Sequence, residues 1–359
     1  MRLSALRIEN LRNIQSLQLE PGAGLNVFVG ANGAGKTSIL EAIYLLSHAH
    51  SFRTRRGELL VRAGQAETTV FAEIESTHGT RRLGLQQAAG RWSARVDNQL
   101  SPNLAEAIRH CAVVCFEPGS HALIAGPSEE RRRFLDWGVF HVEPDFAGLA
   151  ARYRRALRQR NALLRAGTSC DGLLVWDTSL IAAAVPLTQA RARYFERFVT
   201  MAARHLTALL PELGAPILKL SSGWGAQEEP ALSLASARSI DIQRGHTTRG
   251  PHRCDWKLAF EGATRREYLS RGQEKLCALG CMLAQADVFR EDHREWPIVI
   301  LDDLPSELDA DHQAAVMHLL IERGGQVFMT STEVPLTLPS ANRSMEVFHV
   351  ERGQVRILL

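Results

Sequence analysis

A phosphate-binding loop constrains the fold of this 359-residue chain more than any other feature of its sequence. Residues Gly30 to Thr37 read GANGAGKT and match the pattern G-x-x-x-x-G-K-[ST]. The apolar run VFV precedes this loop, and a helical pattern follows it from Lys36 to Ser47. In that context the glycines let backbone N–H groups turn towards one anion, and the helix N-terminus adds partial positive charge. The sequence therefore predicts a nucleotide site formed by Gly30, Ala31, Asn32, Gly33, Ala34, Gly35, Lys36 and Thr37.

Lys36 and Thr37 carry the specific chemistry of such a loop. We expect the Lys36 amine to reach the β- and γ-phosphates of ATP and the Thr37 hydroxyl to hold Mg²⁺. Lysine occurs at four positions, 36, 219, 257 and 275, among 42 lysines and arginines. A coding bias explains the preference for arginine, and against that background the lysine at position 36 indicates a chemical need.

A second element of the site follows the apolar run Ile298 to Leu301, which reads as a buried strand. Asp302 and Asp303 come directly after it. Alone, two acids at the end of a strand are commonly no more than solvated carboxylates. Together with the loop, they predict that Asp302 holds Mg²⁺, through water, and that Asp303 orients or deprotonates the attacking water.

The stretch Ser270-Arg271-Gly272-Gln273 precedes another apolar-periodic helix. Alone, it would be a serine N-cap followed by a helix. The order of loop, long insertion, S-x-G-Q helix, acidic strand and S-E-L-D resembles that of ATP-binding-cassette (ABC) ATPases. That resemblance implies that Ser270, Gly272 and Gln273 contact the γ-phosphate held by a second subunit, so that two chains enclose two ATP molecules.

Hydrophobic periodicity outlines the domains. Strands are expected in residues 1–30 and 68–100, helices from about 101 to 210, strands near 254–262, 296–303 and 324–332, and a hairpin turning at Arg352–Gly353. We expect an α/β protein, an ABC-type P-loop ATPase similar to the heads of SMC proteins, without a long coiled coil. Its lobe I has a mixed sheet and comprises residues 1–110 and 290–359. Its mainly helical lobe II comprises residues 111–289 and carries the S-x-G-Q stretch.

Composition adds little to these motifs. The net charge is +3 and 45% of the residues are hydrophobic, enough for a sizeable core. The sequence has no run of 18 apolar residues and its N-terminus has no signal-peptide core, so we expect a cytoplasmic protein with no membrane contact.

The chain resembles the RecF family of bacterial DNA replication and repair proteins along nearly its whole length. The resemblance is carried by LRIENLRNI, LEAIYLLSHAHSFRT, PSEERRRFLD, YRRALRQRNALL, TTRGPHRCDWKL, LSRGQEKL and LDDLPSELD. It implies an ATP-dependent homodimer that binds DNA, duplex or gapped and single-stranded, and hydrolyses ATP slowly. It also implies a role with RecO and RecR in loading RecA at single-strand gaps. It adds Ser38 to the nucleotide loop and places Arg12 near the nucleotide.

Three departures from the family pattern stand out. Pro305 occupies a position where a small residue is expected, Ile14 replaces an aromatic residue, and Cys115 to His121 replace a more familiar sequence. Thr330 to Thr332 occupy a position where many cassette ATPases have a histidine. None of these differences removes a catalytic group, but the γ-phosphate-sensing role of Cys115 to His121 stays open.

Arginine clusters are candidate DNA contacts. Arg53, Arg55 and Arg56 lie in the SFRT stretch of the resemblance, and we predict that they contact the DNA backbone without reading sequence. The clusters Arg131–Arg133 and Arg152–Arg165 are more simply read as solvated helix faces.

Other functions share parts of this pattern. The main alternative is the ATPase subunit of an ABC-type membrane transporter, although Asp303 and the SFRT and GPHR stretches argue against it. A nucleotide-binding adaptor that never hydrolyses ATP is a third reading, which the complete acidic pair disfavours. A small-molecule P-loop kinase would have no use for the S-x-G-Q helix.

Overall fold

The structure, a computed structural model, describes residues 1–54, 56–167, 170–225, 228–334 and 345–358. The chain divides into two compact units. Unit 1 comprises Met1–Ser120 and Ala278–Leu359, and unit 2 comprises His121–Cys277.

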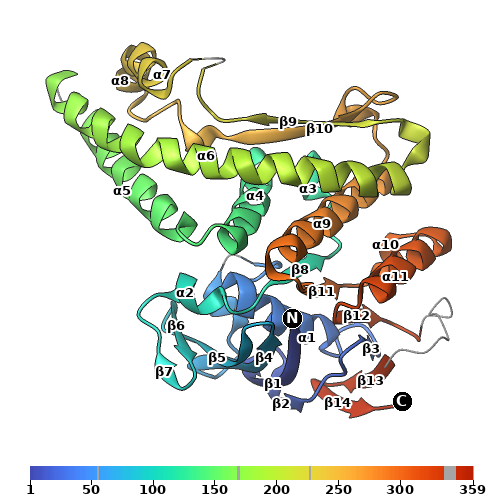
Figure 1. The fold of residues 1–359 in the computed structure, drawn as a ribbon. Coiled ribbons are helices and arrows are strands. Elements are labelled where there is room, and N and C mark those ends of the chain that lie inside the picture. Colours follow the sequence, from blue (N-terminus) through green and yellow to red (C-terminus); the bar gives the residue numbers. More distant parts are fainter. Residues whose placement is uncertain (55, 168–169, 226–227, 335–344, 359) are drawn as a thin grey trace. The chain divides into compact units, whose positions relative to one another are not determined.

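One layer of unit 1 is an antiparallel sheet with the strand order β2-β1-β4-β5-β6-β7 (Figure 1). Burial alternates along β1, where Leu6 and Ile8 are buried while Arg7 and Glu9 are exposed, as expected for a sheet with one face on the core. The strands are β1 (Arg2–Leu11), β2 (Ile14–Leu19), β4 (Glu67–Ser76), β5 (Gly79–Ala88), β6 (Arg91–Val96) and β7 (Gln99–Leu100).

The other layer is a mixed sheet with the order β14-β13-β3-β12-β11-β8. Its strands run parallel except for the edge strand β14, which pairs antiparallel with β13. Strands β3, β11 and β12 are buried at every residue, as parallel strands covered on both faces are. The strands are β3 (Leu25–Val29), β8 (Val113–Phe116), β11 (Ile298–Leu301), β12 (Val327–Ser331), β13 (Met345–Glu351) and β14 (Gln354–Ile357).

Helix α1 (Lys36–His48) contacts both sheets, reaching β1, β4 and β5 on one side and β8 and β12 on the other. Most of its side chains are therefore buried, and they join both sheets in one hydrophobic core. The remaining helical segments of unit 1 are η1 (Gly57–Leu60), α2 (Leu104–Ile108), α10 (Leu304–Glu307) and α11 (Ala310–Arg323).

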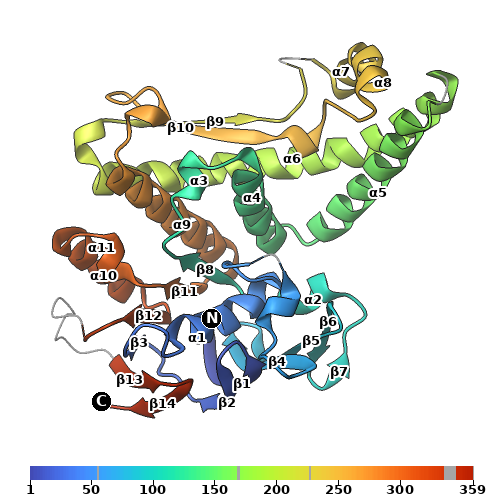
Figure 2. The same cartoon turned by 180° about the vertical axis from the view of Figure 1, so that it is seen from behind.

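Unit 2 is mainly helical, with one two-stranded antiparallel sheet of β9 and β10 lying alongside α6 (Figure 1, Figure 2). The long helix α9 begins in unit 2 and continues into unit 1 beyond Cys277. The elements from residue 121 to 293 are α3 (Ala122–Ala125), α4 (Ser128–Val142), α5 (Phe146–Arg165), α6 (Cys170–Leu209), η2 (Pro211–Leu213), β9 (Pro216–Ser221), α7 (Pro230–Ser236), α8 (Arg238–Arg244), η3 (Pro251–Arg253), β10 (Asp255–Phe260), η4 (Arg266–Tyr268) and α9 (Arg271–His293).

Helix α6 contains a segment, Gly172–Leu209, that is long and apolar enough to cross a membrane by length and composition alone. Within unit 2 this helix packs against α4, α5 and β9. Its Arg191 is buried and forms a two-bond ion pair with Asp136 of α4. These contacts identify α6 as the core helix of unit 2.

The expected fold class is confirmed, and two strands correct the expected elements. We predicted helices throughout residues 101–210, but β8 lies inside this range as the last strand of the mixed sheet. That prediction was wrong because four apolar residues buried on both faces look the same in sequence as part of a buried helix. β9 had no prediction. It pairs with β10, which the sequence did indicate.

Candidate functional site

The predicted loop follows the carboxyl end of β3, the strand flanked by β12 and β13. In parallel sheets this edge is where ligands bind. Gly30, Gly33 and Gly35 have φ values of 151°, 80° and 114°, which other residues rarely adopt. A Cβ atom on Gly30 would lie 2.3 Å from the carbonyl oxygen of Val350 in β13. The loop therefore needs glycine at Gly30 for both backbone angle and space.

The Lys36 amine points back into its own loop. It donates to the carbonyl oxygens of Gly30 at 2.6 Å and Ala31 at 3.0 Å, and the residue is 9% exposed. Burial lowers the pKa of Lys36, while the charges of Asp303 and Asp302 act in the opposite direction. The loop thus holds a buried cation beside two carboxylates.

Asp302 connects the loop to two other strand ends. Its Oδ1 accepts hydrogen bonds from the hydroxyl of Thr37 at 3.0 Å and from that of Thr330 at 2.7 Å. The Thr330 hydroxyl in turn accepts from the backbone N–H of Asp303 at 2.9 Å. Burial raises the pKa of Asp302, and the two hydroxyl bonds act against that shift. Thr37 and Asp302, 265 residues apart in sequence, are therefore brought together as expected.

Thr37 and Asp302 also satisfy the chemistry of a magnesium site. Mg²⁺ prefers hard oxygen ligands and is commonly held by one or two protein oxygens, with water and phosphate in the other positions. A hydroxyl and a carboxylate oxygen 3.0 Å apart beside the phosphate loop match that requirement.

Asp303 is the N-cap of the short helix α10 and has a left-handed conformation with φ 54°. Pro305, one of the departures from the family pattern, lies in the first turn of α10. Proline is tolerated there because its missing N–H would have no partner within the helix.

These groups meet in one cavity of about 330 Å³ in unit 1. The cavity brings together the loop, the acidic pair and Arg12, as the sequence suggested. It is also lined by residues that the sequence did not indicate. The lining residues are Arg12, Asn13, Asn32, Gly33, Gly35, Lys36, Thr37, Ser38, Arg53, Asp302, Asp303 and Thr330.

Arg12 is fixed by Glu41 of α1. Its guanidinium donates to the two carboxylate oxygens at 2.9 and 2.8 Å and to the Leu59 carbonyl at 2.8 Å. Hydrogen bonding to Glu41, which is fully buried, raises the pKa of Arg12. The carboxylate also accepts a hydrogen bond from Ser51. Arg12 is consequently a permanently charged, oriented group on the cavity wall.

Asn13 and Thr330 are site residues that sequence reasoning missed. The Asn13 amide donates to the Gly33 carbonyl at 3.2 Å and accepts from the Ser38 hydroxyl at 3.2 Å, bracing the loop from β1–β2. The position of Asn13 beside Arg12 in LRNI was the available signal. The sequence marks Thr330 only as a position where many cassette ATPases have a histidine.

The three predicted DNA contacts differ in their surroundings. Arg53 lines the nucleotide cavity, where its charge lowers the pKa of Asp302 against the larger effect of burial. Arg56 is exposed and pairs with Glu58 at 3.3 Å. Arg55 lies outside the described residues.

Ser270, Gly272 and Gln273 form the exposed start of α9. The Ser270 hydroxyl accepts from the Gln273 N–H at 3.2 Å, and the Gln273 side chain accepts from the Ser270 N–H at 2.9 Å. This reciprocal pair is a capping box. Ser270 and Gly272 are exposed, so the same turn also presents a hydroxyl and bare backbone to solvent.

The Cys115–His121 segment begins with the last two residues of β8, which pairs with the acidic strand β11. The Asp302 N–H donates to the Phe116 carbonyl at 2.8 Å. Beyond it, Glu117 accepts from the Gly119 N–H and its own N–H donates to Ser120. The segment thus forms a tight turn that starts beside the acidic pair.

Comparison with known proteins covers the whole chain. The model of the RecF/RecN/SMC N-terminal domain matches residues 2–356. A protein of Stenotrophomonas maltophilia called DNA replication and repair protein RecF is 45% identical over 361 residues, 99% of both chains. One of the same name from Shewanella denitrificans is 34% identical over 360 residues, the full length of both.

Solved structures of RecF proteins and of an Smc head have the same fold as this chain. The structure described as the recombination mediator protein RecF-ATPrS in the RecFOR pathway has a TM-score of 0.88 and 26% identity, covering 100% of this chain and 98% of the other. An Smc head bound to the C-terminal winged-helix domain of ScpA has a TM-score of 0.60 at 15% identity, covering 100% and 97%, which shows a shared fold.

Proposed function

This chain belongs to the RecF family of DNA replication and repair proteins, and from that premise we propose that it is an ATP-dependent DNA-binding protein of recombinational repair. It dimerises on DNA with ATP, hydrolyses ATP slowly, and acts in the cytoplasm with RecO and RecR to load RecA at single-strand gaps. The structures called RecF-ATP and RecF-ATPrS in the RecFOR pathway support ATP as the ligand and this pathway as the context.

The nucleotide site supports the ATPase part of the proposal. The loop N–H groups and Lys36 contact the phosphates, and the Lys36 amine exchanges its bonds to the Gly30 and Ala31 carbonyls for phosphate oxygens. Arg12 adds a second fixed cation. Thr37 and Asp302 hold Mg²⁺, which neutralises phosphate charge when bound. Asp303 orients or deprotonates the attacking water.

The exposed start of α9 supports the dimer. Ser270 presents an exposed hydroxyl and Gly272 an exposed position without a side chain at the N-terminus of the helix. A helix N-terminus attracts phosphate. In the proposed dimer this turn contacts the γ-phosphate bound by the other subunit, and neither chain completes a hydrolytic site alone.

Arg53 connects DNA to this site. It lines the nucleotide cavity and belongs to the segment whose other arginines, Arg55 and Arg56, are proposed to contact DNA phosphates. A DNA backbone that moves this segment also moves a charge beside Asp302. DNA is accordingly expected to alter ATP turnover.

The observation that carries the ATPase proposal is the hydrogen bond between Thr37 and Asp302 within the cavity that Lys36 lines. The ATPase subunit of a membrane transporter would share it. The match to RecF proteins over essentially their full length favours the repair function.

Sizing the protein by light scattering tests the proposal. With ATP and Mg²⁺ the mass should double, and gapped duplex DNA should stabilise the dimer and change phosphate release. A chain that stays monomeric with ATP, on gapped and intact DNA alike, would contradict it. ADP serves as the matched control because it lacks the γ-phosphate that the second subunit contacts.

A further inference from the structure

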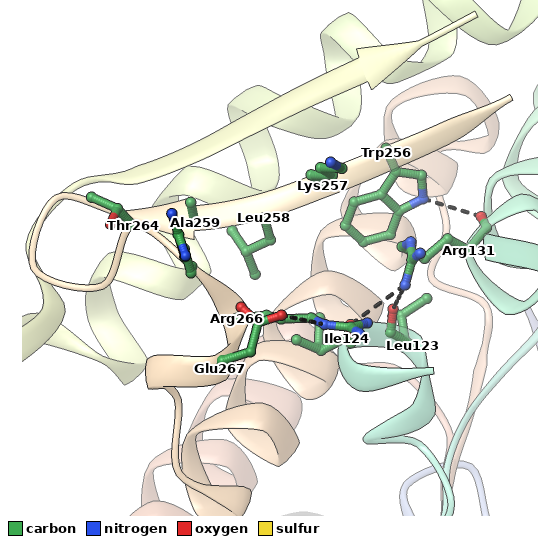
Figure 3. A pocket seen from close by; sticks show the side chains of 11 residues that line it. Leu123, Ile124, Arg131, Trp256, Lys257, Leu258, Ala259, Thr264, Arg266 and Glu267 are labelled. Carbon is green, nitrogen blue, oxygen red and sulfur yellow. Dashed lines mark hydrogen bonds and ion pairs between the residues drawn. The ribbon is translucent and has the colours of Figure 1, made fainter. Parts of the chain in front are cut away.

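Unit 2 contains a cavity of about 440 Å³ beside β10, separate from the nucleotide site and not used by the proposed function (Figure 3). It lies between β10, the short helix α3 and the turn that precedes α9 (Figure 3). Its volume is within the range of sites that bind a ligand or a peptide side chain. The lining residues are Leu123, Ile124, Arg131, Trp256, Lys257, Leu258, Ala259, Thr264, Arg265, Arg266 and Glu267.

The edge of β10 borders this cavity. Trp256, Lys257, Leu258 and Ala259 are consecutive and all line it. Because successive side chains of a strand point to opposite faces, four consecutive residues can share one cavity only where the strand's edge faces it. The other edge of β10 is paired with β9 over all six residues.

Backbone pairing identifies the groups on this edge. Glu261 donates its N–H to Ala215, next to β9, whereas Phe260 exchanges hydrogen bonds with Ala263, on the opposite side. Alternation along the strand then directs the N–H and C=O of Leu258 away from β9 and towards the cavity. In the described parts of the chain neither group has a hydrogen-bond partner. Unpaired strand edges are templates for an added strand.

The cavity walls are apolar on one side and basic on the other. Leu123, Ile124, Trp256 and Leu258 are largely or fully buried and form an apolar floor. Arg131 is fully engaged by Asp255 and by the carbonyl groups of the α3 segment, with Nε donating to the Asp255 carboxylate at 2.7 Å.

Arg266 is also engaged, because it pairs with Glu267 and donates to the Ala125 carbonyl at 2.8 Å. By contrast, Lys257 and Arg265 are exposed, and neither has an ion-pair partner among the described residues. Two exposed cations without an ion pair among the described residues therefore border the cavity, and the charge of one of them, Arg265, contributes to lowering the pKa of Glu267.

We propose that the free edge of β10 is a docking site for an extended segment of another protein, in which apolar side chains alternate with acidic ones. Its backbone pairs with the N–H and C=O of Leu258 and adds a third strand to the β9–β10 sheet. Its apolar side chains enter the cavity on the Trp256 and Leu258 face. Its carboxylates lie on the opposite face, near Lys257 and Arg265. The proposal extends beyond the ATPase function and requires no nucleotide.

A display selection tests this directly. A library of random 12-residue peptides is selected on the full-length protein without ATP, and in parallel on a Lys257→Glu/Arg265→Glu variant. Both side chains are exposed, so the variant should fold, which circular dichroism checks. We expect peptides that alternate acidic and apolar residues to be enriched on the wild-type protein only.

The consensus peptide is then synthesised with a fluorophore and measured by anisotropy. Lys257→Glu/Arg265→Glu should weaken binding at least about tenfold, since charge reversal places like charges together. Arg244→Glu, an exposed charge reversal on α8, should leave the affinity unchanged within about twofold. Methylating alternate backbone nitrogens of the peptide should abolish binding, and hydrogen exchange at the Leu258 N–H should slow in the complex.

The proposal is overturned if the two selections enrich the same peptides, or if backbone methylation leaves the affinity intact. It is also overturned if a single-stranded oligonucleotide displaces the peptide and binds more tightly at the same salt concentration, because the surface would then be a nucleic-acid contact. Since no ATP is present, each of these results leaves the ATPase proposal standing.

Discussion

At the scale of single residues, Asp302 and Asp303 are neighbours with different surroundings. Asp302 is 5% exposed and accepts two hydroxyl hydrogen bonds, so its carboxylate is held in one place. Asp303 is turned by a left-handed backbone and is anchored through its N–H, which leaves its side chain on the cavity wall. The chain thus holds the Asp302 carboxylate in one place and leaves the Asp303 carboxylate on the cavity wall, which suits the metal-ligand and general-base roles proposed for them.

Asp303→Asn should therefore bind ATP normally but lose hydrolysis by about 10²-fold or more, the usual contribution of a general base. The wild-type rate itself should lie well below ~10 s⁻¹, because aspartate is one methylene shorter than the glutamate of fast cassette ATPases. Phosphate release and binding of a fluorescent ATP analogue measure the two effects. Asp311→Asn on α11, which replaces an exposed aspartate outside the nucleotide cavity, is the control. Full turnover in Asp303→Asn would remove it from the mechanism.

His252 in unit 2 makes stability depend on pH. Its Nδ1 accepts from the Tyr153 hydroxyl at 2.6 Å and its Nε2 donates to the Thr247 carbonyl at 2.9 Å, so both nitrogens are used by the neutral ring. Burial lowers the pKa of His252 from 6.5 to about 4, with nearby Arg253 and Arg132 adding to the shift and Asp241 opposing it.

Between these pKa values the unfolded chain takes up a proton and the folded chain does not, so stability falls as the pH falls below 6.5. At pH 5 the loss attributable to His252 should be about 2 kcal/mol relative to pH 8. Urea unfolding of the wild type and of His252→Gln at both pH values measures it, and the variant should lose less. His78→Gln, an exposed histidine, should behave as the wild type. Equal pH slopes for His252→Gln and the wild type would contradict this assignment.

At the scale of elements, the C-terminal hairpin β13–β14 braces the phosphate loop. The Val350 carbonyl lies against Gly30, and the Gly353 N–H donates to the Ala34 carbonyl at 2.7 Å. The loop is thus held between the helix that it starts and a hairpin from the far end of the chain.

Two alanine substitutions in the loop distinguish the cost of a positive φ angle from the cost of a steric clash with β13. Gly33→Ala meets no atom within 4 Å and should cost only the positive-φ penalty of about 1–2 kcal/mol. Gly30→Ala adds a Cβ 2.3 Å from Val350 and should destabilise unit 1 more and abolish ATP binding. Thermal unfolding with and without ATP distinguishes them. The bracing role fails if Gly30→Ala is no less stable than Gly33→Ala.

Sequence reasoning predicted the elements whose patterns are local. The strand before the loop, helix α1, the acidic strand and the final hairpin are all confirmed, because a local signal accompanies each of them: the glycine-rich loop, the pair of acids or the Arg352–Gly353 turn. β8 was missed because four apolar residues in a helical stretch have no period of their own. Thr330 and Asn13 were missed because their roles arise from side-chain hydrogen bonds between distant strands, which no spacing reveals.

At the scale of the whole molecule, two inactive variants should complement each other and regain ATPase activity when they are mixed. Lys36→Ala should not bind ATP, and Ser270→Arg should bind ATP but not dimerise, because arginine occupies the place of the hydroxyl. Mixed, they can form one composite site with an intact loop and an intact turn. Phosphate release should return to part of the wild-type rate, although each protein alone is inactive.

Measuring the mass of each variant with ATP by light scattering tests the composite-site proposal independently. Ser270→Ala is the matched control, since it removes the hydroxyl without adding bulk and should weaken dimerisation less than Ser270→Arg. If Ser270→Arg dimerises with ATP as the wild type does, the turn before α9 is a capping box and nothing more.

The strand order of the mixed sheet also determines how long β3 must wait during translation for the strands that pair with it. β3 lies between β12 and β13, and its Asn26 bonds to the carbonyl of Val327, 301 residues later in the chain. At about 5–20 residues per second, a ribosome needs about 15 to 60 s to cover that interval. During this interval neither β12 nor β13 has been synthesised, so β3 has no strand to pair with. Unit 2, in contrast, is a continuous segment between the two halves of unit 1, so all of it is synthesised before unit 1 is complete. The nascent protein must therefore carry, until translation is nearly finished, an unpaired strand in which four of five residues are apolar and all five are buried in the folded protein, so we expect chaperones at the ribosome exit to bind it.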